Sequence, residues 1–198
     1  SAEPAPAPPT GGLHWEIDPM PDTPTGLPNA GETFDPDTLR VEIPPAMQRA
    51  RRWLLWRYQR PSSPNGKPRK VPYYTTGQRR TGKLDVDRDQ ERLGTLDDAL
   101  SAAAKRAEYG VGFALGADES GHHWQGVDLD GIDQRPELAA LVDQLPGYIE
   151  RSPSGHGVHA IGVGADFDGL GSNATGIEAY CKGRYFTVTG DAIGGDLE

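Results

Sequence analysis

The stretch Gly126–Gly131 reads Gly-Val-Asp-Leu-Asp-Gly, and its alternation of apolar and acidic residues is typical of a β-strand. Successive side chains of a strand point to opposite faces, so Val127 and Leu129 are expected to face a core. Asp128 and Asp130 then share the other face, roughly 7 Å apart, and repel each other by about 2 kcal/mol at an effective dielectric constant near 20. A divalent cation relieves that repulsion, but a strand running into a polar turn has the same sequence pattern.

Short apolar segments and a few helical patterns surround this stretch. Strands are expected at residues 53–56, 70–74, 111–115, 125–130, 148–151, 158–163, 177–181 and 185–189. Helices are expected from Pro44 or Pro45 to Arg52, from Leu96 to Tyr109 and from Pro136 to Leu145. Because these elements do not alternate strictly, the sequence predicts an α+β fold, with a mainly antiparallel or mixed sheet and flanking helices.

The amino-terminal segment differs from the rest of the chain in composition. Residues 1–37 are rich in proline and acidic residues and poor in periodic apolar positions. We expect them to form an irregular or disordered leader, followed by one folded domain at residues 38–198.

The net charge of −9 hides three blocks of different sign. Residues 1–42 carry −7, residues 43–84 carry +11 without a single acid, and residues 85–198 carry −13. A uniformly acidic protein would repel nucleic acid. A basic block beside an acidic one instead suggests a phosphate-binding surface and a separate site for metal ions.

The lone cysteine, Cys181, excludes an internal disulfide and a cysteine-rich zinc site. His122 and His123 have no cysteine or carboxylate at zinc-ligand spacing nearby, so a solvent loop is expected there and structural zinc is not. The sequence has no apolar run long enough for a membrane span and no signal-peptide pattern. We therefore expect a cytoplasmic protein with no membrane partner.

Two further segments carry groups suited to phosphate and metal chemistry. Ser152–His159 is a turn of small residues that leads into an apolar strand. Glycine lets backbone amides approach an anion, and histidine adds a donor. Gly176–Tyr180 places Glu178 on the face opposite Ile177 and Ala179, although a single strand glutamate is usually just a solvated side chain.

Three features follow one another along the chain: the acidic pair, the glycine-rich turn ending in histidine, and the strand glutamate. In this order they resemble the catalytic core of the archaeo-eukaryotic primase superfamily. The resemblance is to the primase-polymerase domains of phage and plasmid replication proteins. Its most specific part is Gly183–Gly190, which reads Gly-Arg-Tyr-Phe-Thr-Val-Thr-Gly. The resemblance covers about residues 50–192 and leaves the leader outside.

The resemblance implies an RRM-like core and a nucleotidyltransferase that uses two Mg²⁺ or Mn²⁺ ions and a dNTP or NTP substrate. Asp128, Asp130 and Glu178 would be the catalytic metal ligands, and His159 would contact the triphosphate. Further nucleotide contacts would come from the turn and from two cationic side chains: Ser154, Gly155, His156, Gly157, Lys70 and Arg184. His159 is preferred as the ligand histidine because it ends the turn and enters the strand, with His156 as the alternative.

The basic block is interleaved with tryptophan and tyrosine, a pattern that favours contact with a single-stranded template or a primer-template. The expected nucleic-acid contacts are the basic residues Arg51, Arg52, Arg57, Lys67, Arg69, Arg79 and Arg80. Relatives in this family often continue into a helicase region, so a helicase region or partner is expected, with the chain itself a monomer. Two other classes of function stay open. One is a catalytically idle DNA-binding or helicase-recruiting module, and the other is a metal-dependent nuclease.

Overall fold

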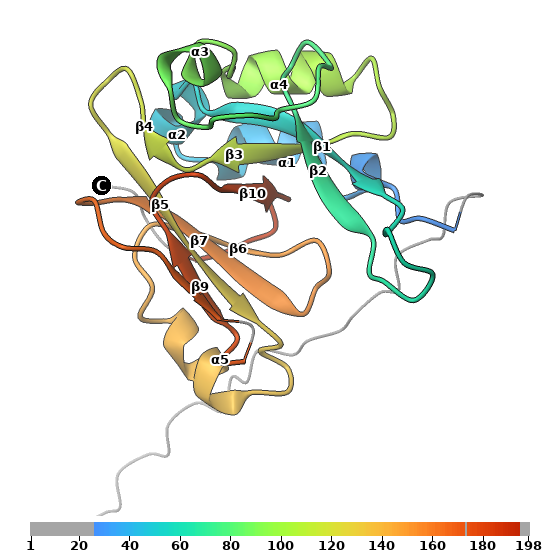
Figure 1. The fold of residues 1–198 in the computed structure, drawn as a ribbon. Coiled ribbons are helices and arrows are strands. Elements are labelled where there is room, and N and C mark those ends of the chain that lie inside the picture. Colours follow the sequence, from blue (N-terminus) through green and yellow to red (C-terminus); the bar gives the residue numbers. More distant parts are fainter. Residues whose placement is uncertain (1–25, 173, 195–198) are drawn as a thin grey trace, which may run out of the picture.

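The computed structural model describes residues 26–172 and 174–194, which form two β-sheets with helices packed against them (Figure 1). All strand pairs between the named strands of this part are antiparallel, which confirms the α+β class with antiparallel sheets. Most of the expected leader lies outside the described residues. The boundary expected at residue 38 falls inside the first α-helix, α1 (Pro36–Glu42). No helix of the described residues has the length and apolar character needed to cross a bilayer.

The first sheet carries the aromatic strands of the basic block. Its strands follow the order β10 (Tyr185–Val188), β3 (Gly110–Ala114), β1 (Trp53–Gln59) and β2 (Arg69–Tyr73). Trp53 on β1 lies opposite Phe113 on β3, and the two rings meet edge to face at 5.2 Å. Such aromatic cross-strand pairs stabilise a sheet, which explains why β1 and β3 form its centre.

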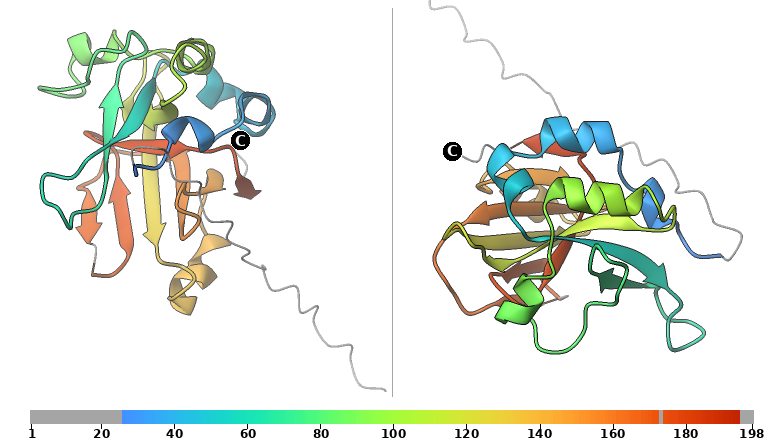
Figure 2. Two further views of the ribbon diagram at one scale, coloured as in Figure 1. Left: turned by 90° about the vertical axis from the view of Figure 1, so that its right-hand side faces the viewer. Right: turned by 90° about the horizontal axis from the view of Figure 1, so that it is seen from above.

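Helices cover one face of the first sheet, as the view from above shows (Figure 2). They are η1 (Ala30–Glu32), α1, α2 (Pro45–Arg49) and α4 (Leu96–Ala103), with the short α3 (Asp87–Gln90) in a separate loop. Buried side chains of these helices and of the sheet form one core, which includes Leu39, Met47, Leu100, Val111 and Phe113. This core holds α1, α2 and α4 against the first sheet.

All three expected helices are shorter than the sequence pattern suggested, and the one expected to reach Leu145 is α5 (Pro136–Val142). Thr95 caps α4 as expected, with its hydroxyl accepting from the Asp98 amide in a capping box, but the helix ends at Ala103 and not at Tyr109. Turns replace its last part, because the Arg106 amide bonds back to Ala103 and its guanidinium reaches the Thr76 carbonyl. Similarly, α2 stops at Arg49, and the indole of Trp53 then donates to the Met47 carbonyl.

The second sheet carries the acidic segments. Its order is β11 (Ala192–Gly194), β6 (Tyr148–Arg151), β7 (Gly157–Val163), β5 (His123–Asp130), β9 (Ile177–Tyr180) and β8 (Leu170–Ser172), with β4 (Gly116–Ala117) also paired to β5. Helix α5 (Pro136–Val142) packs on one face of this sheet, against Val127 and Leu129. The apolar pair of the central strand therefore faces a core as predicted, and Asp128 and Asp130 point to the other face.

The chain crosses between the sheets three times, which the sequence did not predict. It passes from β3 to β4 through Leu115, from β9 to β10 and from β10 to β11. Because β10 pairs with the first sheet yet follows β9 directly, its Phe186 ring comes to lie 4.9 Å from the ring of His159 on β7. The acidic face of the second sheet is thus partly covered by the edge of the first.

Candidate active site

Four ionisable residues form a row across the second sheet. Asp128 on β5 lies directly opposite His159 on β7 and Glu178 on β9, and His159 lies directly opposite Glu150 on β6. Directly opposed residues of antiparallel strands point to the same face and have neighbouring side chains. Glu150, His159, Asp128 and Glu178 therefore share one face, in that order.

A cavity of about 370 Å³ lies over this row, between the two sheets. Five of the residues expected to bind metal or nucleotide line it: Lys70, Asp128, His159, Glu178 and Arg184. The other lining residues are the aromatic and hydroxyl residues of β9 and β10, namely Tyr180, Tyr185, Phe186 and Thr187. Residues distant in the sequence thus meet in one concave site that contains acids, an imidazole and two cations.

Asp128 has an unusual environment for a carboxylate. Its side chain is 26% exposed, but Oδ1 is buried and has no hydrogen-bond partner, and Nε2 of His159 lies 3.8 Å away. Burial raises the pKa of Asp128. The nearby carboxylates of Asp130 and Glu178 raise this pKa further, and His159 and Lys70 lower it. An unsatisfied buried acceptor costs about 1–3 kcal/mol. A cation bound at Oδ1 would remove that cost, so this residue fits a divalent-metal ligand.

The other two acids lie on either side of Asp128. Asp130 is exposed at the end of β5, opposite Gly157, where the absence of a side chain leaves room for its carboxylate. Glu178 accepts a hydrogen bond from the Tyr180 hydroxyl at 3.2 Å. In the described chain, the oxygens of the three acids do not all lie within 4.8 Å of one another. Joint binding of one ion would therefore need rotation of the Asp130 or Glu178 side chain.

His159 is held by contacts on three sides. Its ring is buried, and Nδ1 lies 2.9 Å from the Thr187 carbonyl, which can only accept, so Nδ1 carries the hydrogen and Nε2 points toward Asp128. Phe186 packs on the ring. Gly126 makes this packing possible, because a Cβ at that position would lie 2.4 Å from the Phe186 ring.

Behind His159 lies Glu150, which the sequence analysis missed. Its side chain is fully buried, and its carboxylate accepts from the Tyr148 hydroxyl at 2.8 Å and from the amides of Thr189 and Gly190. Oε1 lies 3.7 Å from Nδ1 of His159. The strand carrying Glu150 was predicted, but one acid in a short apolar strand gives no signal of which face it occupies.

The glycine-rich turn between β6 and β7 separates the two candidate histidines. The turn closes through Ser152, whose amide bonds to the Gly157 carbonyl, and Gly155 adopts a φ of +74°. His156 is exposed at its tip, with Nδ1 3.0 Å from the Asp133 carboxylate in the loop after β5. His156 is not part of the cavity lining, whereas His159 faces Asp128.

Two cationic side chains border the cavity from other elements. Lys70 extends from β2 of the first sheet. Loss of solvation lowers its pKa, while the charges of Asp128 and Asp130 raise it, although its side chain still reaches solvent. Arg184 follows β9, and its guanidinium lies 4.9 Å from the centre of the Tyr180 ring. Both cations are placed to offset negative charge on a ligand.

Two of the expected nucleic-acid contacts are structural instead. Arg52 and Arg80 are 1% and 3% exposed. Arg52 donates to the Ala114 carbonyl at 2.9 Å and to Asp85 at 2.8 Å, and Arg80 forms a 2.6 Å ion pair with Asp89. The expectation that these two residues contact DNA was wrong, because buried arginines paired with carboxylates cannot reach a phosphate backbone.

The remaining five basic residues differ in how available they are. Arg51 donates to the Leu93 carbonyl, and Arg57 is partly buried against Tyr73 and 3.6 Å from Glu108. Arg51, Lys67, Arg69 and Arg79 are exposed. Lys67 and Arg69 belong to the β1–β2 hairpin, which extends away from the helices in Figure 1 and whose second strand also carries Lys70.

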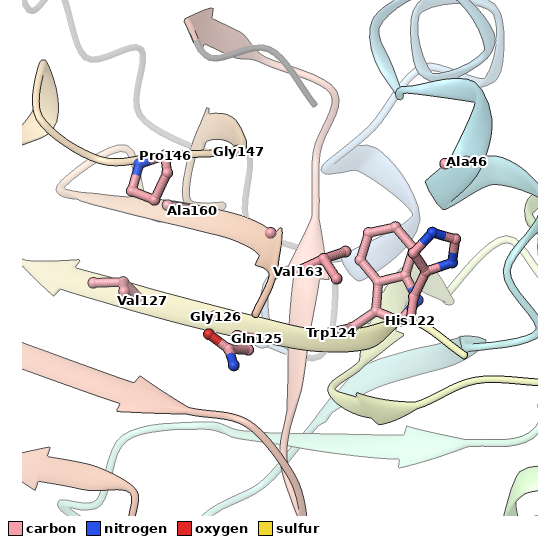
Figure 3. Close-up of a pocket in the computed structure, with 11 residues that line it drawn as sticks. Ala46, His122, Trp124, Gln125, Gly126, Val127, Pro146, Gly147, Ala160 and Val163 are labelled. Atoms are coloured by element: carbon pink, nitrogen blue, oxygen red, sulfur yellow. The ribbon is translucent and has the colours of Figure 1, made fainter. Parts of the chain in front are cut away.

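A second cavity, of about 390 Å³, has a different character. It lies beside β5 and β7, where Trp124, Val127 and Val163 give it a mainly apolar lining (Figure 3). Its one ionisable lining residue is His122. A lining with so little charge is unsuited to binding a triphosphate, so the cavity over Asp128 is the candidate active site.

Comparison with known proteins found a similar phage protein. This chain is similar to the DNA primase-polymerase of Nitratiruptor phage NrS-1. The two are 27% identical over 168 residues, which covers 78% of this chain and 21% of the phage protein. This chain thus spans about a fifth of the length of that relative. No family model matches it. The similarity supports a relationship to primase-polymerases.

Proposed function

We propose that this chain catalyses template-directed nucleotidyl transfer, joining nucleoside triphosphates to a 3′-hydroxyl as a DNA primase, a DNA polymerase or both. The observation that carries the proposal is the buried, unpartnered oxygen of Asp128, set between His159 and Glu178 in a cavity bordered by Lys70 and Arg184. The similarity to a phage DNA primase-polymerase supports the same class of reaction.

Each side chain has a role in this proposal. Asp128, Asp130 and Glu178 would hold two Mg²⁺ or Mn²⁺ ions, which would supply positive charge to offset the charge on the transferring phosphoryl group. In this proposal His159 is an imidazolium, which donates from Nε2 to the triphosphate while its Nδ1–H stays on the Thr187 carbonyl, and the fixed ring keeps Nε2 in place. Lys70 and Arg184 offset the remaining phosphate charge. The reaction then depends on positioning and charge, without a covalent nucleophile.

The template would bind along the β1–β2 hairpin. Its exposed Lys67 lies toward the hairpin tip from Lys70, and Arg69, on the opposite face of β2, adds a further positive charge to the same hairpin. Such contacts are sequence-independent and salt-dependent. A single-stranded template or a primer-template fits these charges, and we include in the proposal a helicase region or partner and a role in replicating a mobile element.

A primer-extension gel separates the candidate functions. The full chain is incubated with primer-template, labelled triphosphates and Mn²⁺ or Mg²⁺. Extended products support the proposal, degraded DNA would instead indicate a nuclease, and unaltered DNA with retained binding would indicate an idle binding module.

The decisive variant is Asp128→Asn combined with Asp130→Asn, which removes two charges with little change in shape. Incorporation should fall to background, since the metal ligands are lost, while DNA binding persists or tightens. The matched control is Glu137→Gln with Asp143→Asn, which removes the same charge from exposed positions of α5 and the residue after it. A folded double variant that still incorporates at the wild-type rate would exclude this site.

A further inference from the structure

Three segments meet where β5 begins, away from the row of acids. His123 is the first residue of β5, Cys181 directly follows β9, and Asp166 lies in the connection between β7 and β8. One ring nitrogen, the thiol sulfur and one carboxylate oxygen of these residues all lie within 4.8 Å of one another. In the part of the chain that the structure describes, this is the group of three potential metal ligands that meets that spacing.

The contacts at Cys181 are polar, which is unusual for a buried free cysteine. Its sulfur lies 2.9 Å from Oδ1 of Asp166 and 3.0 Å from the Phe167 carbonyl. Nε2 of His123 lies 2.9 Å from the backbone carbonyl of Cys181, which holds the imidazole beside the thiol. Cys181 is buried, His123 half-buried and Asp166 exposed, so an ion can enter from the Asp166 side.

We propose that His123, Asp166 and Cys181 bind one Zn²⁺ ion, at a site separate from the acidic row. Thiolate and imidazole favour zinc, whereas Mg²⁺ and Mn²⁺ prefer oxygen ligands. Bonds of the usual zinc lengths place ligand atoms roughly 3.5 Å apart, so small side-chain rotations bring the three atoms to binding distance. Three protein ligands leave a fourth position for water.

Binding of Zn²⁺ displaces a proton from Cys181. The S–H bond of Cys181 is replaced by an S–Zn bond, and its proton leaves to solvent. Asp166 also forms a 3.0 Å ion pair with Lys182, whose side chain is exposed, so zinc competes with an ammonium group that is free to move into solvent.

Zinc at this position would add a bond between segments that already contact one another through hydrogen bonds. It would tie the start of β5 and the β7–β8 connection to the turn that begins at Cys181 and leads to Arg184. Its binding does not depend on nucleotidyl transfer, so the two proposals stand or fall separately.

Cobalt absorption tests the ligand set directly. The full chain is stripped of metal with a chelator and titrated with Co²⁺, whose bond to a thiolate gives a charge-transfer band that neither imidazole nor carboxylate gives. We expect a band that saturates at one ion per chain, that Zn²⁺ abolishes, and that is lost in His123→Ala and Cys181→Ser. His122→Ala is the matched control, because it changes the adjacent histidine, which contacts Ser120, and it should keep the band. Absence of the band in the wild type, or its persistence in His123→Ala, would overturn the proposal.

A second measurement needs no cysteine variant. Cys181 is the only cysteine of the chain, so alkylation by iodoacetamide reports on this site alone. Zn²⁺ should slow alkylation at least tenfold in the wild type and in Asp128→Asn, and Mg²⁺ should not. In His123→Ala and Asp166→Asn the protection should be at least tenfold weaker. Equal rates with and without Zn²⁺ would overturn the proposal.

Discussion

Glu150 and His159 lie directly opposite each other on β6 and β7, with Oε1 of the glutamate 3.7 Å from Nδ1 of the histidine. The carboxylate lies on the Nδ1 side of the ring, and Asp128 lies on the Nε2 side. A buried negative charge on the Nδ1 side of an imidazole stabilises the ring in this orientation, and it also stabilises a positive charge on the ring. We infer that Glu150 is a positioning residue for the proposed triphosphate contact.

Glu150→Gln should raise the KM for triphosphate about tenfold with little change in kcat, by analogy with residues that orient metal-binding histidines, which contribute about that much. Steady-state primer extension with varied triphosphate measures the split. Tyr148→Phe is the control, because it removes one hydrogen bond to the same carboxylate and keeps the charge. If Glu150→Gln lowers the melting temperature and leaves KM unchanged, Glu150 has only a structural role.

The two histidines of the glycine-rich segment should differ in effect. His159→Ala should raise the triphosphate requirement and leave metal binding by the acids largely in place, because the imidazole is proposed to contact phosphate. His156→Ala should do less, since its side chain is exposed and bonded to Asp133 outside the cavity. Triphosphate titrations of both variants give the ranking, and the reverse order would place the nucleotide along the turn instead of over β5.

Basic residues of the hairpin should contribute to DNA binding without affecting stability. Lys67→Ala and Arg69→Ala should each weaken binding across all DNA sequences and reduce the slope of log K against log salt by about 1. Lys105→Ala removes one exposed cation beyond the end of α4 and should leave the slope unchanged. Fluorescence anisotropy at several salt concentrations measures this. Unchanged slopes in both hairpin variants would move the template path elsewhere.

The extent of the leader can be tested by truncation. The sequence predicts that residues 1 to about 35 are dispensable for catalysis. In the structure Ala30 is buried, its carbonyl packs beside Gly110 of β3, and Asp35 caps α1. Deletion of residues 1–25 should therefore keep extension within tenfold of wild type, while deletion of residues 1–35 should lower the melting temperature. If deletion of residues 1–25 lowered extension by more than tenfold, the leader would contribute to the site.

Short apolar runs predicted β1 and β3, which are buried on both faces, and alternation of apolar and acidic residues predicted β5, which has one apolar face. The strand Tyr148–Arg151 was predicted with the bounds that the structure has, and β5 with only its start misplaced. Short elements without such a pattern were missed, among them β8 and β11. So was the division into two sheets, since pairing partners depend on crossings that no local pattern encodes.

The same limit applied to side chains. Arg52 and Arg80 looked like surface cations because their partners, Asp85 and Asp89, lie in a loop whose position only the fold reveals. His123 was set aside for lack of a nearby cysteine, yet Cys181 follows it by 58 residues and ends beside it. Burial and long-range contact, which decide both cases, are not properties of a short stretch of sequence.

The ion pair between Arg80 and Asp89 gives a prediction about pH. Burial would raise the pKa of Asp89, but hydrogen bonds from Arg80, the Asp85 amide and the Tyr74 hydroxyl outweigh it and lower the pKa to about 2. An unfolded aspartate titrates near pH 3.9, so between about pH 4 and 2 the unfolded state binds more protons. Asp89 therefore stabilises the fold by about 2–3 kcal/mol above that window, and this contribution disappears as the pH falls through it.

Asp89→Asn should lower the free energy of unfolding at pH 7 by about 3 kcal/mol, because it removes the nearer counter-charge of the buried Arg80 and leaves only Asp85, at 3.9 Å. The difference from wild type should shrink by about 2–3 kcal/mol as the pH is lowered from about 4 to 2, since the wild-type aspartate becomes protonated there too. Urea denaturation at a series of pH values measures both quantities. Asp87→Asn, an exposed neighbour in α3, should change little at any pH. A difference for Asp89→Asn that stays constant from pH 7 to pH 2 would show that its charge does not hold this loop in place.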